Sequence, residues 1–459
     1  MTSSLHTDVA VIGAGTAGVN AFHELRRAGC TALLVDHGPL GTTCARVGCM
    51  PSKAALHAGR AWSTVRSVLG TALPADAAPD ALWRHAIATR DKLAAGAAQR
   101  TRSGVGDALV MGTARFAGPD ALEVDGRRIH ARAFVVATGS RPVLPDGLAA
   151  LGTRVLTTDS LFELPALPRS IGILGLGAIG LELGLAFSRL GVDVIAGDLS
   201  PTIAGIADPV VAARARQRFG SELTMWLGHP LEAHAAGSGV TLRNTEHSAD
   251  VDVVLAALGR RPNVEGLALA AAGVRLDARG QPVFDTATLR AGDTAVFFAG
   301  DVNPDRPLMH EAADEGVIAA RGALALLGHA DAPVPPRRVP LSIVFSDPDV
   351  ASVGLSFDRL NPQQVVIGTA EGSGNGRSRI LGAEDNLVRL YAARDTGRVL
   401  GAGLLATHGE HLAHLLAWAV QRGDTVQDLL ALPFYHPSIE EMVQSALKDA
   451  LRQLAPTTD

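Results

Sequence analysis

The sequence has few cysteines, little net charge and no long apolar run. Three cysteines in 459 residues are too few for the disulfide framework of a secreted protein, which favours the cytoplasm. A formal net charge of −5 is small for this length and argues against a nucleic-acid partner. The most apolar stretch, residues 171–187, contains Glu182 and several glycines, so it predicts a strand, a turn and a helix and not a membrane span.

No signal peptide is expected either. The first apolar run, residues 9–12, leads directly into a glycine-rich loop. Hydrophobic residues make up 47% of the chain and charged residues 19%, which is typical of a globular protein with a large core. At roughly 150 residues per domain, this length predicts about three domains. We therefore expect a soluble cytoplasmic protein with neither a membrane nor a nucleic-acid partner.

A nucleotide-binding motif lies close to the N-terminus. Residues 8–36 read DVAVIGAGTAGVNAFHELRRAGCTALLVD, which predicts a strand, a glycine turn, a helix and a second strand. Gly13, Gly15 and Gly18 fit the pattern G-x-G-x-x-G: the first glycine permits the tight turn, the second lets the backbone approach a pyrophosphate, and the third lets the helix pack on the strand. Asp36 closes the second strand, where a carboxylate accepts hydrogen bonds from ribose hydroxyls.

The same motif occurs a second time, 162 residues later. Gly175, Gly177 and Gly180 repeat the glycine pattern, and Asp198 repeats the acid. A carboxylate at this place favours a free ribose 2′-hydroxyl and repels the 2′-phosphate of NADP. Residues 199–205 contain no Arg or Lys that would neutralise such a phosphate. This second site is therefore predicted to bind NAD(H), and the alternative is that Asp198 only caps a turn.

A further pair of similar segments shows where the two copies differ. Residues 131–142 (ARAFVVATGSRP) match residues 251–262 (VDVVLAALGRRP) at an offset of 120. The offset falls from 162 to 120. The first copy therefore carries 42 more residues between its glycine motif and this second repeated segment. Repeats of this size indicate two related domains, the first of which contains an insertion.

The insertion contains two of the three cysteines. Residues 41–53 read GTTCARVGCMPSK and place Cys44 and Cys49 five residues apart. Two thiols this close form and reopen a disulfide, which is the basis of thiol–disulfide exchange. Beside a flavin, such a pair would relay electrons between a dithiol substrate and the cofactor. Cys30, at the start of an expected strand over residues 31–35, is predicted to be an inert buried thiol.

Three other segments are expected near the cofactors. An apolar strand over residues 295–299 ends in Gly300 and Asp301, where a carboxylate can bind a second hydroxylated part of a long cofactor, although Gly-Asp is also a common turn. Thr138 with Gly139, and residues 259–263, are expected to be turns at strand ends.

A base is needed to remove a proton from a thiol, because a free thiol has an ordinary pKa of about 8.5. His436 suits this task, since histidine titrates near neutral pH. Glu441 would orient the imidazole and stabilise its charged form. The two are expected to meet across a turn and the start of a helix, with Pro437 near the first helical position. The alternative is that His436 caps a helix.

These pieces, in this order, resemble the pyridine nucleotide–disulfide oxidoreductases (class I) over nearly the whole chain. Residues 41–53 match the family pattern GGTCxxxGCxPSK except at Thr42, and FYHPSIEE (residues 434–441) matches its HPxxxE signature. The resemblance implies an α/β fold with two Rossmann-like nucleotide-binding domains, for FAD and NAD, and an α+β C-terminal dimerisation domain. It divides the chain into an FAD domain with the redox insertion (1–147), an NAD(H) domain (148–266), a central part completing the FAD domain (267–336) and the dimerisation domain (337–459).

The resemblance also implies roles for individual residues. Cys44 exchanges with the substrate, and Cys49 passes electrons to the flavin. The histidine comes from the opposite subunit, so a homodimer is expected. Lys53 lies beside the flavin N5 and pairs with Glu182, for which the alternative is a solvent-facing position on its helix. The FAD site comprises Gly13, Gly15, Gly18, Asp36, Thr43, Lys53, Thr138, Gly139 and Asp301, and the NAD site comprises Gly175, Gly177, Gly180, Asp198 and Gly259.

Within the family, Lys53, Asp198 and the absence of further cysteines at either end look most like the dihydrolipoyl dehydrogenases. The expected reaction is dihydrolipoamide plus NAD+ to lipoamide plus NADH, with a small dithiol or the lipoyl domain of a 2-oxoacid dehydrogenase-type complex as partner. One alternative is an NADH-dependent reductase of another disulfide or oxidised small molecule, like a mercuric or glutathione reductase. A second alternative is a flavoprotein that senses or binds without turnover.

Three positions depart from the family and leave the substrate open. Thr42 adds a side chain close to the expected FAD pyrophosphate. Arg46, between the two cysteines, should lower thiolate pKa values and attract an acidic substrate. Phe434 stands where many relatives have a second histidine. No metal site is expected, and His408, His411 and His414 are interpreted as ordinary surface or interface histidines.

Overall fold

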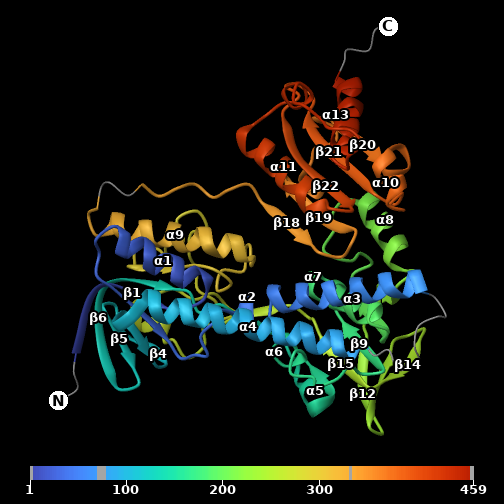
Figure 1. Ribbon diagram of the computed structural model, residues 1–459. Helices are drawn as coiled ribbons and strands as arrows, with labels where there is room; N and C mark the ends of the chain where they lie inside the picture. Colours follow the sequence, from blue (N-terminus) through green and yellow to red (C-terminus); the bar gives the residue numbers. More distant parts are fainter. Residues whose placement is uncertain (1–3, 70–78, 330–332, 455–459) are drawn as a thin grey trace. The chain divides into compact units, whose positions relative to one another are not determined.

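A computed structural model describes residues 4–69, 79–329 and 333–454 of the chain. These residues form two compact units, each drawn in Figure 1. The first unit contains residues 4–51, 86–143, 259–329 and 333–337. The second unit contains residues 52–69, 79–85, 144–258 and 338–454.

The first unit is built on a seven-stranded sheet with the order β3-β2-β1-β6-β5-β4, in which β17 also pairs with β6. Five strands of this sheet run parallel to one another: β1 (Ser4–Ile12), β2 (Ala32–Asp36), β3 (Leu109–Met111), β6 (Arg127–Val136) and β17 (Val296–Phe298). The strands β4 (Ala114–Gly118) and β5 (Ala121–Val124) continue the sheet in antiparallel fashion. All five parallel strands therefore end at the same edge, where an open α/β sheet binds its ligands.

Each face of this sheet has its own apolar core. On one face, α1 (Thr16–Arg27) and α9 (Met309–Leu326) pack over Val9 and Val11. On the other face, Ala10 and Ile12 pack with side chains from β4, β5 and β6. Successive residues of a strand point to opposite faces, so a continuous apolar run fills both cores. Both faces are therefore covered, as expected for a parallel sheet.

The helices α1 and α9 cross at close range because of a glycine. A side chain at Gly316 would place its Cβ only 2.3 Å from the carbonyl oxygen of Ala17. This distance is shorter than any real carbon–oxygen contact, so only glycine allows the two backbones to approach in this way. The contact positions α9 against the helix that follows the first glycine turn.

The second unit contains a second parallel sheet, with the order β11-β10-β9-β15-β8. Its strands are β8 (Val155–Leu156), β9 (Ser170–Leu174), β10 (Asp193–Asp198), β11 (Thr224–Leu227) and β15 (Val253–Ala256). The helices α7 (Ala178–Arg189) and α8 (Pro209–Phe219) alternate with these strands. An antiparallel sheet of β12 (Glu232–Ala236), β13 (Gly239–Arg243) and β14 (Ser248–Val251) precedes β15.

The two parallel sheets are copies of one arrangement. The order β3-β2-β1-β6 in the first unit matches the order β11-β10-β9-β15 in the second. The bounds of α1 and α7 differ by the predicted 162 residues at both ends. The strands β7 (Ser140–Pro142) and β16 (Arg260–Pro262), which pair with each other, differ by the predicted 120. The internal repeat read from the sequence is confirmed.

The extra residues of the first copy lie between its second and third strands. This segment contains α2 (Thr43–Arg46), α3 (Cys49–Leu69) and α4 (Asp80–Val105), whereas only α8 connects β10 to β11. Cys44 lies in α2, and Cys49 is the first residue of α3. The predicted insertion is therefore helical, and both cysteines belong to it.

Residues 338–454 of the second unit form a five-stranded antiparallel sheet with the order β18-β19-β22-β21-β20. Its strands are β18 (Leu341–Val344), β19 (Asp349–Gly354), β20 (Val365–Glu371), β21 (Leu387–Ala393) and β22 (Val399–Ala406). The helices α11 (Gly409–Arg422) and α13 (Glu441–Leu454) pack on this sheet and share one core with it (Figure 1). This part is an α+β layer, unlike the two parallel sheets.

Short elements complete the chain. The α-helical ones are α5 (Asp146–Ala149), α6 (Thr158–Leu161), α10 (Gly376–Ile380) and α12 (Val426–Leu430). Short 3₁₀ turns cover Gly106–Ala108, Gly152–Arg154, Leu269–Ala272, Phe357–Arg359 and Gly372–Gly374. Among the described residues, no helix has both the length and the apolar character that crossing a membrane requires.

The fold class predicted from the sequence is confirmed, with small shifts of two strands. The strand expected over residues 31–35 covers 32–36, and the one expected over residues 295–299 covers 296–298. Cys30 lies just before β2, is only 3% exposed, and has its thiol pKa raised by burial. The four domain boundaries given above stay a prediction.

Candidate active site

The first glycine turn joins β1 to α1. Gly13 has a φ of +106°, and a Cβ there would lie 2.3 Å from the carbonyl oxygen of Ala137. A Cβ on Gly18 would lie 1.8 Å from the carbonyl oxygen of Gly13, so this glycine lets α1 pack against the turn. Gly15 is different, because a Cβ there would meet nothing closer than 4.0 Å. Two of the glycines thus build the turn, and the third leaves its surface open.

The start of α1 is suited to an anion. Gly15 is the N-cap residue, so no side chain accepts a hydrogen bond from the first amides of this 12-residue helix. Asp36 holds the turn from the neighbouring strand: its Oδ2 accepts from Ala14 N at 2.6 Å and its Oδ1 from Gly38 N at 2.5 Å. Free amides, an open Gly15 surface and a fixed carboxylate at the strand end fit the pyrophosphate and ribose of a dinucleotide.

The second glycine turn has nearly the same geometry. Gly175 has a φ of +96°, with a Cβ position 2.5 Å from the carbonyl oxygen of Ala257, and Gly177 has open space around its Cβ position. Asp198 accepts from Leu176 N at 2.6 Å and from Ser200 N at 2.8 Å. The two turns thus share both the backbone conformation at the first glycine and the hydrogen bond from a loop amide to the aspartate at the end of the next strand. Both turns fit a dinucleotide.

Asp301 follows β17 and belongs to a small polar network. Ser140 donates to Asp301 Oδ2 at 3.0 Å, and Arg260 Nε donates to Ser140 Oγ at 2.8 Å. The Nε of Arg260 also lies 3.9 Å from Asp301 Oδ2. The sequence analysis named Asp301 and placed residues 259–263, which include Arg260, in a turn near the cofactors, but it did not name Ser140. Both Ser140 and Arg260 belong to the segments that repeat at an offset of 120.

Thr138 and Gly139 lie in the turn between β6 and β7. The Thr138 hydroxyl donates to the carbonyl oxygen of Asn263 at 2.7 Å, and Asn263 Nδ2 donates to the Thr138 carbonyl oxygen at 3.1 Å. These bonds join two turns that the sequence placed near the cofactors. Gly259 directly precedes β16 and belongs to the first unit, whereas the other predicted NAD residues belong to the second.

A buried glutamate supports the turn that carries Asp301, and the sequence reading missed it. Glu315 in α9 is 1% exposed and accepts from Gly300 N at 2.8 Å and from Asn303 Nδ2 at 2.9 Å. Arg337 also donates to its carboxylate. Burial raises the pKa of Glu315 to about 7, although the Gly300 amide and the Arg337 charge oppose this. No local signal singled out Glu315, because Glu311 and Asp314 lie close to it in the same helix and only the fold shows that Glu315 is buried.

The two cysteines of the insertion flank a tight turn. A Cβ on Gly48 would lie 3.1 Å from the Thr43 carbonyl oxygen and 3.3 Å from Cys44 Cα, so a glycine here lets the end of the turn approach Cys44. Cys44 and Cys49 are both half-buried, and Thr43 is exposed. This arrangement keeps the sulfur-bearing segment compact and partly accessible, as thiol exchange requires.

Two of the departures from the family pattern have structural roles. Thr42 is the N-cap of α2, and its Oγ1 accepts from Ala45 N at 3.2 Å. Its φ of +59° is one that glycine adopts more readily, so the cap is gained at some backbone strain. The guanidinium of Arg46 donates to the Pro39 carbonyl oxygen at 3.4 Å. Arg46 therefore braces the segment before the cysteines.

The predicted partners Lys53 and Glu182 are brought together in the second unit. Lys53 Nζ lies 2.8 Å from both carboxylate oxygens of Glu182, which is 4% exposed. Ser52 Oγ and Phe345 N donate to the same carboxylate, each at 3.1 Å. The solvent-facing alternative for Glu182 is wrong, because α7 is buried on this side as well.

His436 and Glu441 are also brought together. His436 Nδ1 lies 3.0 and 3.2 Å from the two carboxylate oxygens of Glu441, and Ser438 N donates to Glu441 at 3.0 Å. The hydrogen bond from His436 holds the pKa of Glu441 below its ordinary value. With Nδ1 engaged, Nε2 is the nitrogen left to take a proton, and the side chain is 77% exposed. The expectation for Pro437 is wrong, because α13 begins at Glu441.

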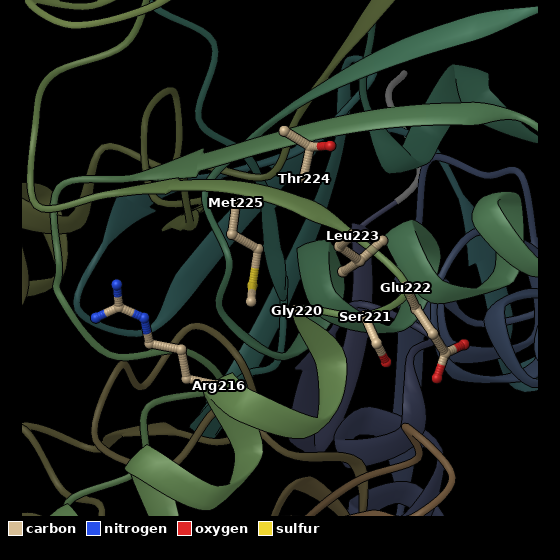
Figure 2. A pocket seen from close by; sticks show the side chains of 7 residues that line it. All are labelled: Arg216, Gly220, Ser221, Glu222, Leu223, Thr224 and Met225. Atoms are coloured by element: carbon tan, nitrogen blue, oxygen red, sulfur yellow. The ribbon is translucent and has the colours of Figure 1, made fainter.

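One surface pocket of the second unit is lined by none of these residues. Figure 2 shows it at the end of α8 and the start of β11, lined by Arg216, Gly220, Ser221, Glu222, Leu223, Thr224 and Met225. Glu222 is already engaged by Arg189 at 2.7 Å and by Arg218 at 2.7 Å. None of the predicted site residues lines this pocket, so it adds nothing to the candidate site.

Comparison with known proteins agrees with this geometry. Residues 7–316 match the family model of the pyridine nucleotide-disulphide oxidoreductases, and residues 340–447 match the model of their dimerisation domain. Dihydrolipoyl dehydrogenase of Thermus scotoductus is 31% identical over 97% of this chain and 98% of its own. Dihydrolipoyl dehydrogenase of Pseudomonas aeruginosa is 30% identical over 98% of this chain and 99% of its own.

Two solved structures have a similar fold. LpdA from Mycobacterium tuberculosis has a TM-score of 0.83 and 23% identity, over 98% of this chain and 100% of its own. The HOCl-induced flavoprotein disulfide reductase RclA from Escherichia coli has a TM-score of 0.82 and 22% identity, over 97% of this chain and 99% of its own. At these identities the likeness shows the fold alone.

Proposed function

The chain belongs to the pyridine nucleotide-disulphide oxidoreductase family, and from this premise we propose that it is a dihydrolipoyl dehydrogenase. It is an FAD- and NAD(H)-linked oxidoreductase with a dimerisation domain that supports a homodimer. The proposed reaction oxidises a dihydrolipoyl dithiol to the cyclic disulfide and reduces NAD+. The partner is a free dithiol or the lipoyl domain of a 2-oxoacid dehydrogenase-type complex.

The observation that carries the choice within the family is Asp198. Its carboxylate is fixed at the end of β10 by the amides of Leu176 and Ser200. A fixed negative charge at this place accepts ribose hydroxyls and repels a 2′-phosphate, which favours NAD(H) over NADP(H). The two relatives at about 30% identity bear the same enzyme name. The low cysteine count supports a cytoplasmic site of action.

The proposed cofactor sites follow from the two glycine turns. We assign Gly13, Gly15, Gly18 and Asp36 to the FAD pyrophosphate and adenosine ribose, and Asp301 with its Ser140 and Arg260 network to the rest of the FAD chain. The NAD site uses Gly175, Gly177, Gly180 and Asp198. When bound, FAD supplies the two-electron chemistry that links a dithiol to a nicotinamide.

The cysteine pair carries out the sulfur chemistry. In the oxidised enzyme a substrate thiolate attacks Cys44 Sγ, which forms a mixed disulfide and releases Cys49 as a thiolate. The second substrate thiolate then attacks the substrate sulfur of the mixed disulfide, which releases the cyclic disulfide and leaves Cys44 reduced. Both electrons of the substrate thus reside on the enzyme dithiol, with Cys49 the sulfur nearer the flavin.

His436 and Glu441 handle the protons of this exchange. His436 Nε2 removes a proton from a substrate thiol, and Glu441 stabilises the imidazolium through the 3.0 Å contact to Nδ1. In the homodimer, His436 of one subunit serves the cysteine pair of the other. Lys53 would hold a positive charge beside a bound flavin, and Glu182 keeps the ammonium group in place.

A steady-state assay of the purified yellow protein tests the proposal. Dihydrolipoamide with NAD+ should be turned over well, and NADP+ should be a poor substitute. Cys44→Ser should abolish this activity and retain bound FAD, whereas Cys30→Ala, which alters a buried thiol outside the relay, should keep it. Dithiol turnover that survives Cys44→Ser would contradict the sulfur relay.

Arg46 supports a second candidate, an NADH-driven reductase of another, acidic disulfide or oxidised small molecule. A guanidinium between the two cysteines is a cation within the exchange segment, even though it also braces Pro39. Brisk NADH oxidation by such an acceptor, with negligible turnover of dihydrolipoamide, would favour this candidate. Arg46→Ser should then raise the KM for the acidic acceptor.

A further inference from the structure

Three side chains with metal-binding atoms meet where β22 leads into α11. His408 is the N-cap residue of α11, Glu410 lies in the first turn, and His411 follows it. One nitrogen from each histidine and one carboxylate oxygen lie within 4.8 Å of one another. His411 Nε2 lies 3.6 Å from Glu410 Oε1. We call these three residues the His408 cluster.

The backbone of the His408 cluster is held from two sides. His411 N donates to the His408 carbonyl oxygen at 3.1 Å, and His414 Nδ1 donates to the Glu410 carbonyl oxygen at 2.6 Å. From β19, Asp349 Oδ2 accepts from Glu410 N at 3.2 Å. The three donor residues therefore lie on a fixed turn, with the two histidine side chains exposed and the glutamate side chain half-buried between them and Asp349.

Acidic side chains lie beside the two histidines. Glu410 is in the first turn of α11, and Asp349, which is 7% exposed, accepts from Glu410 N. Acidic side chains at this place offset the positive end of the α11 dipole, which would otherwise oppose a cation.

We propose that His408, Glu410 and His411 bind one divalent transition-metal ion per chain, with Zn²⁺ as the reference ion and water completing the coordination. Two imidazoles and one carboxylate suit Zn²⁺ and its neighbours, whereas Mg²⁺ and Ca²⁺ prefer oxygen donors. Ligand atoms around tetrahedral Zn²⁺ lie about 3.4 Å apart, so donors within 4.8 Å need only small side-chain rotations.

The site shares no residue with the proposed redox machinery. The His408 cluster belongs to the second unit and to the segment matched by the dimerisation-domain model, whereas Cys44 and Cys49 belong to the first unit. A bound ion would tie the end of β22 to the first turn of α11 and stabilise this segment. The proposal goes beyond the proposed function and does not depend on it.

Calorimetric titration of the chelator-treated, FAD-loaded dimer with Zn²⁺ tests the site. Accessible thiols are first alkylated with iodoacetamide, so that cysteines do not act as ligands. We expect one ion per chain with a Kd of about 10 μM or tighter. Co²⁺ in place of Zn²⁺ should give visible absorption bands of a nitrogen- and oxygen-ligated ion.

Variants decide whether these residues are the ligands. His411→Gln should weaken Zn²⁺ binding at least about tenfold, and so should His408→Asn, in which asparagine tolerates the positive φ of +56°. His234→Gln is the matched control, since His234 is exposed and lies 3.2 Å from Glu232 without a third donor residue. Absence of saturable binding below about 100 μM would overturn the proposal, and so would equal binding by all three variants.

Discussion

Lys53 and Glu182 form an ion pair in which Nζ lies 2.8 Å from both carboxylate oxygens. The carboxylate is nearly fully buried and also receives hydrogen bonds from Ser52 and from the Phe345 amide. Ser52 and the Phe345 amide thus fix the carboxylate that holds the ammonium group, and the ammonium nitrogen lies 4.6 Å from the centre of the Phe345 ring. The pair joins the inserted helix α3 to α7, the helix of the second glycine turn.

Glu182→Gln should weaken both stability and turnover. The substitution leaves Lys53 charged beside a neutral amide, and breaking a buried pair costs about 3 kcal/mol or more. We expect a fall of that order in the free energy of unfolding and at least a tenfold loss of dithiol turnover, measured by urea unfolding and steady-state kinetics. Glu371→Gln is the control, because its pair with Arg214 is exposed and should be worth less than about 1 kcal/mol. Equal effects of the two variants would contradict the role given to Glu182.

Glu441→Gln should slow turnover with little change in KM. The substitution removes the charge that stabilises the imidazolium of His436, so we expect a fall in kcat of about 100-fold. Glu441 carries this charge at neutral pH, because the hydrogen bond from His436 holds its pKa below the ordinary value. Glu440→Gln, which alters the neighbouring carboxylate, should leave both kcat and KM close to the parent values.

Asp198→Ser should relax the choice of nicotinamide. It removes the negative charge that we expect to repel a 2′-phosphate and weakens the bonds to Leu176 N and Ser200 N. The KM for NAD+ should rise about tenfold, and the preference for NAD+ over NADP+ should fall by a similar factor. Asp193→Asn, at the exposed start of β10, serves as control and should change neither value. An unchanged preference in Asp198→Ser would show that Asp198 only caps the turn.

Glu315 should make stability depend on pH. Its pKa is raised to about 7 in the folded protein, above the ordinary value of 4.5, so the folded state holds the proton more tightly than the unfolded state. The stabilisation from protonated Glu315 is complete below pH 4.5 and is lost as the pH rises through 7. At 1.4 kcal/mol per pKa unit, this amounts to about 3 kcal/mol.

Unfolding of Glu315→Gln in urea, followed by circular dichroism and by flavin release, tests this prediction. The difference in stability from the parent should change between pH 4.5 and 7 and stay constant above. Glu265→Gln is the control with the opposite sign, because hydrogen bonding to Arg141 lowers the pKa of Glu265 to about 2. The difference in the free energy of unfolding between Glu265→Gln and the parent should stay constant from pH 4.5 to 7. A flat difference for Glu315→Gln would mean that the carboxylate is charged throughout.

The features read correctly from the sequence are local ones. Gly13, Gly18 and their counterparts were recognisable because a tight turn and close helix packing each require glycine at a fixed spacing. The repeat offsets of 162 and 120 reappear in the bounds of α1 and α7 and of β7 and β16, because a duplicated segment folds by the same local rules. The pairing of His436 with Glu441 was also readable, since only five residues separate them.

Other features required the folded chain. The sequence placed Pro437 near the start of a helix, but the helix begins at Glu441, whose carboxylate accepts from both His436 and Ser438 N. The contact between Glu315 and Arg337, and the approach of Asp349 to Glu410, join residues that are far apart in the sequence. Which distant polar groups meet depends on how whole helices pack on sheets, and no local pattern encodes that.

The sequence by itself thus determined the duplicated nucleotide-binding fold, the redox cysteine pair and the family, because turn geometry and thiol chemistry depend on residues close together in the chain. The tertiary structure alone decided how the distant polar groups are partnered: Ser140 with Asp301, Gly300 with Glu315, and Asp349 with Glu410. Burial makes an unpaired polar group costly, so packing selects those partners from across the whole chain.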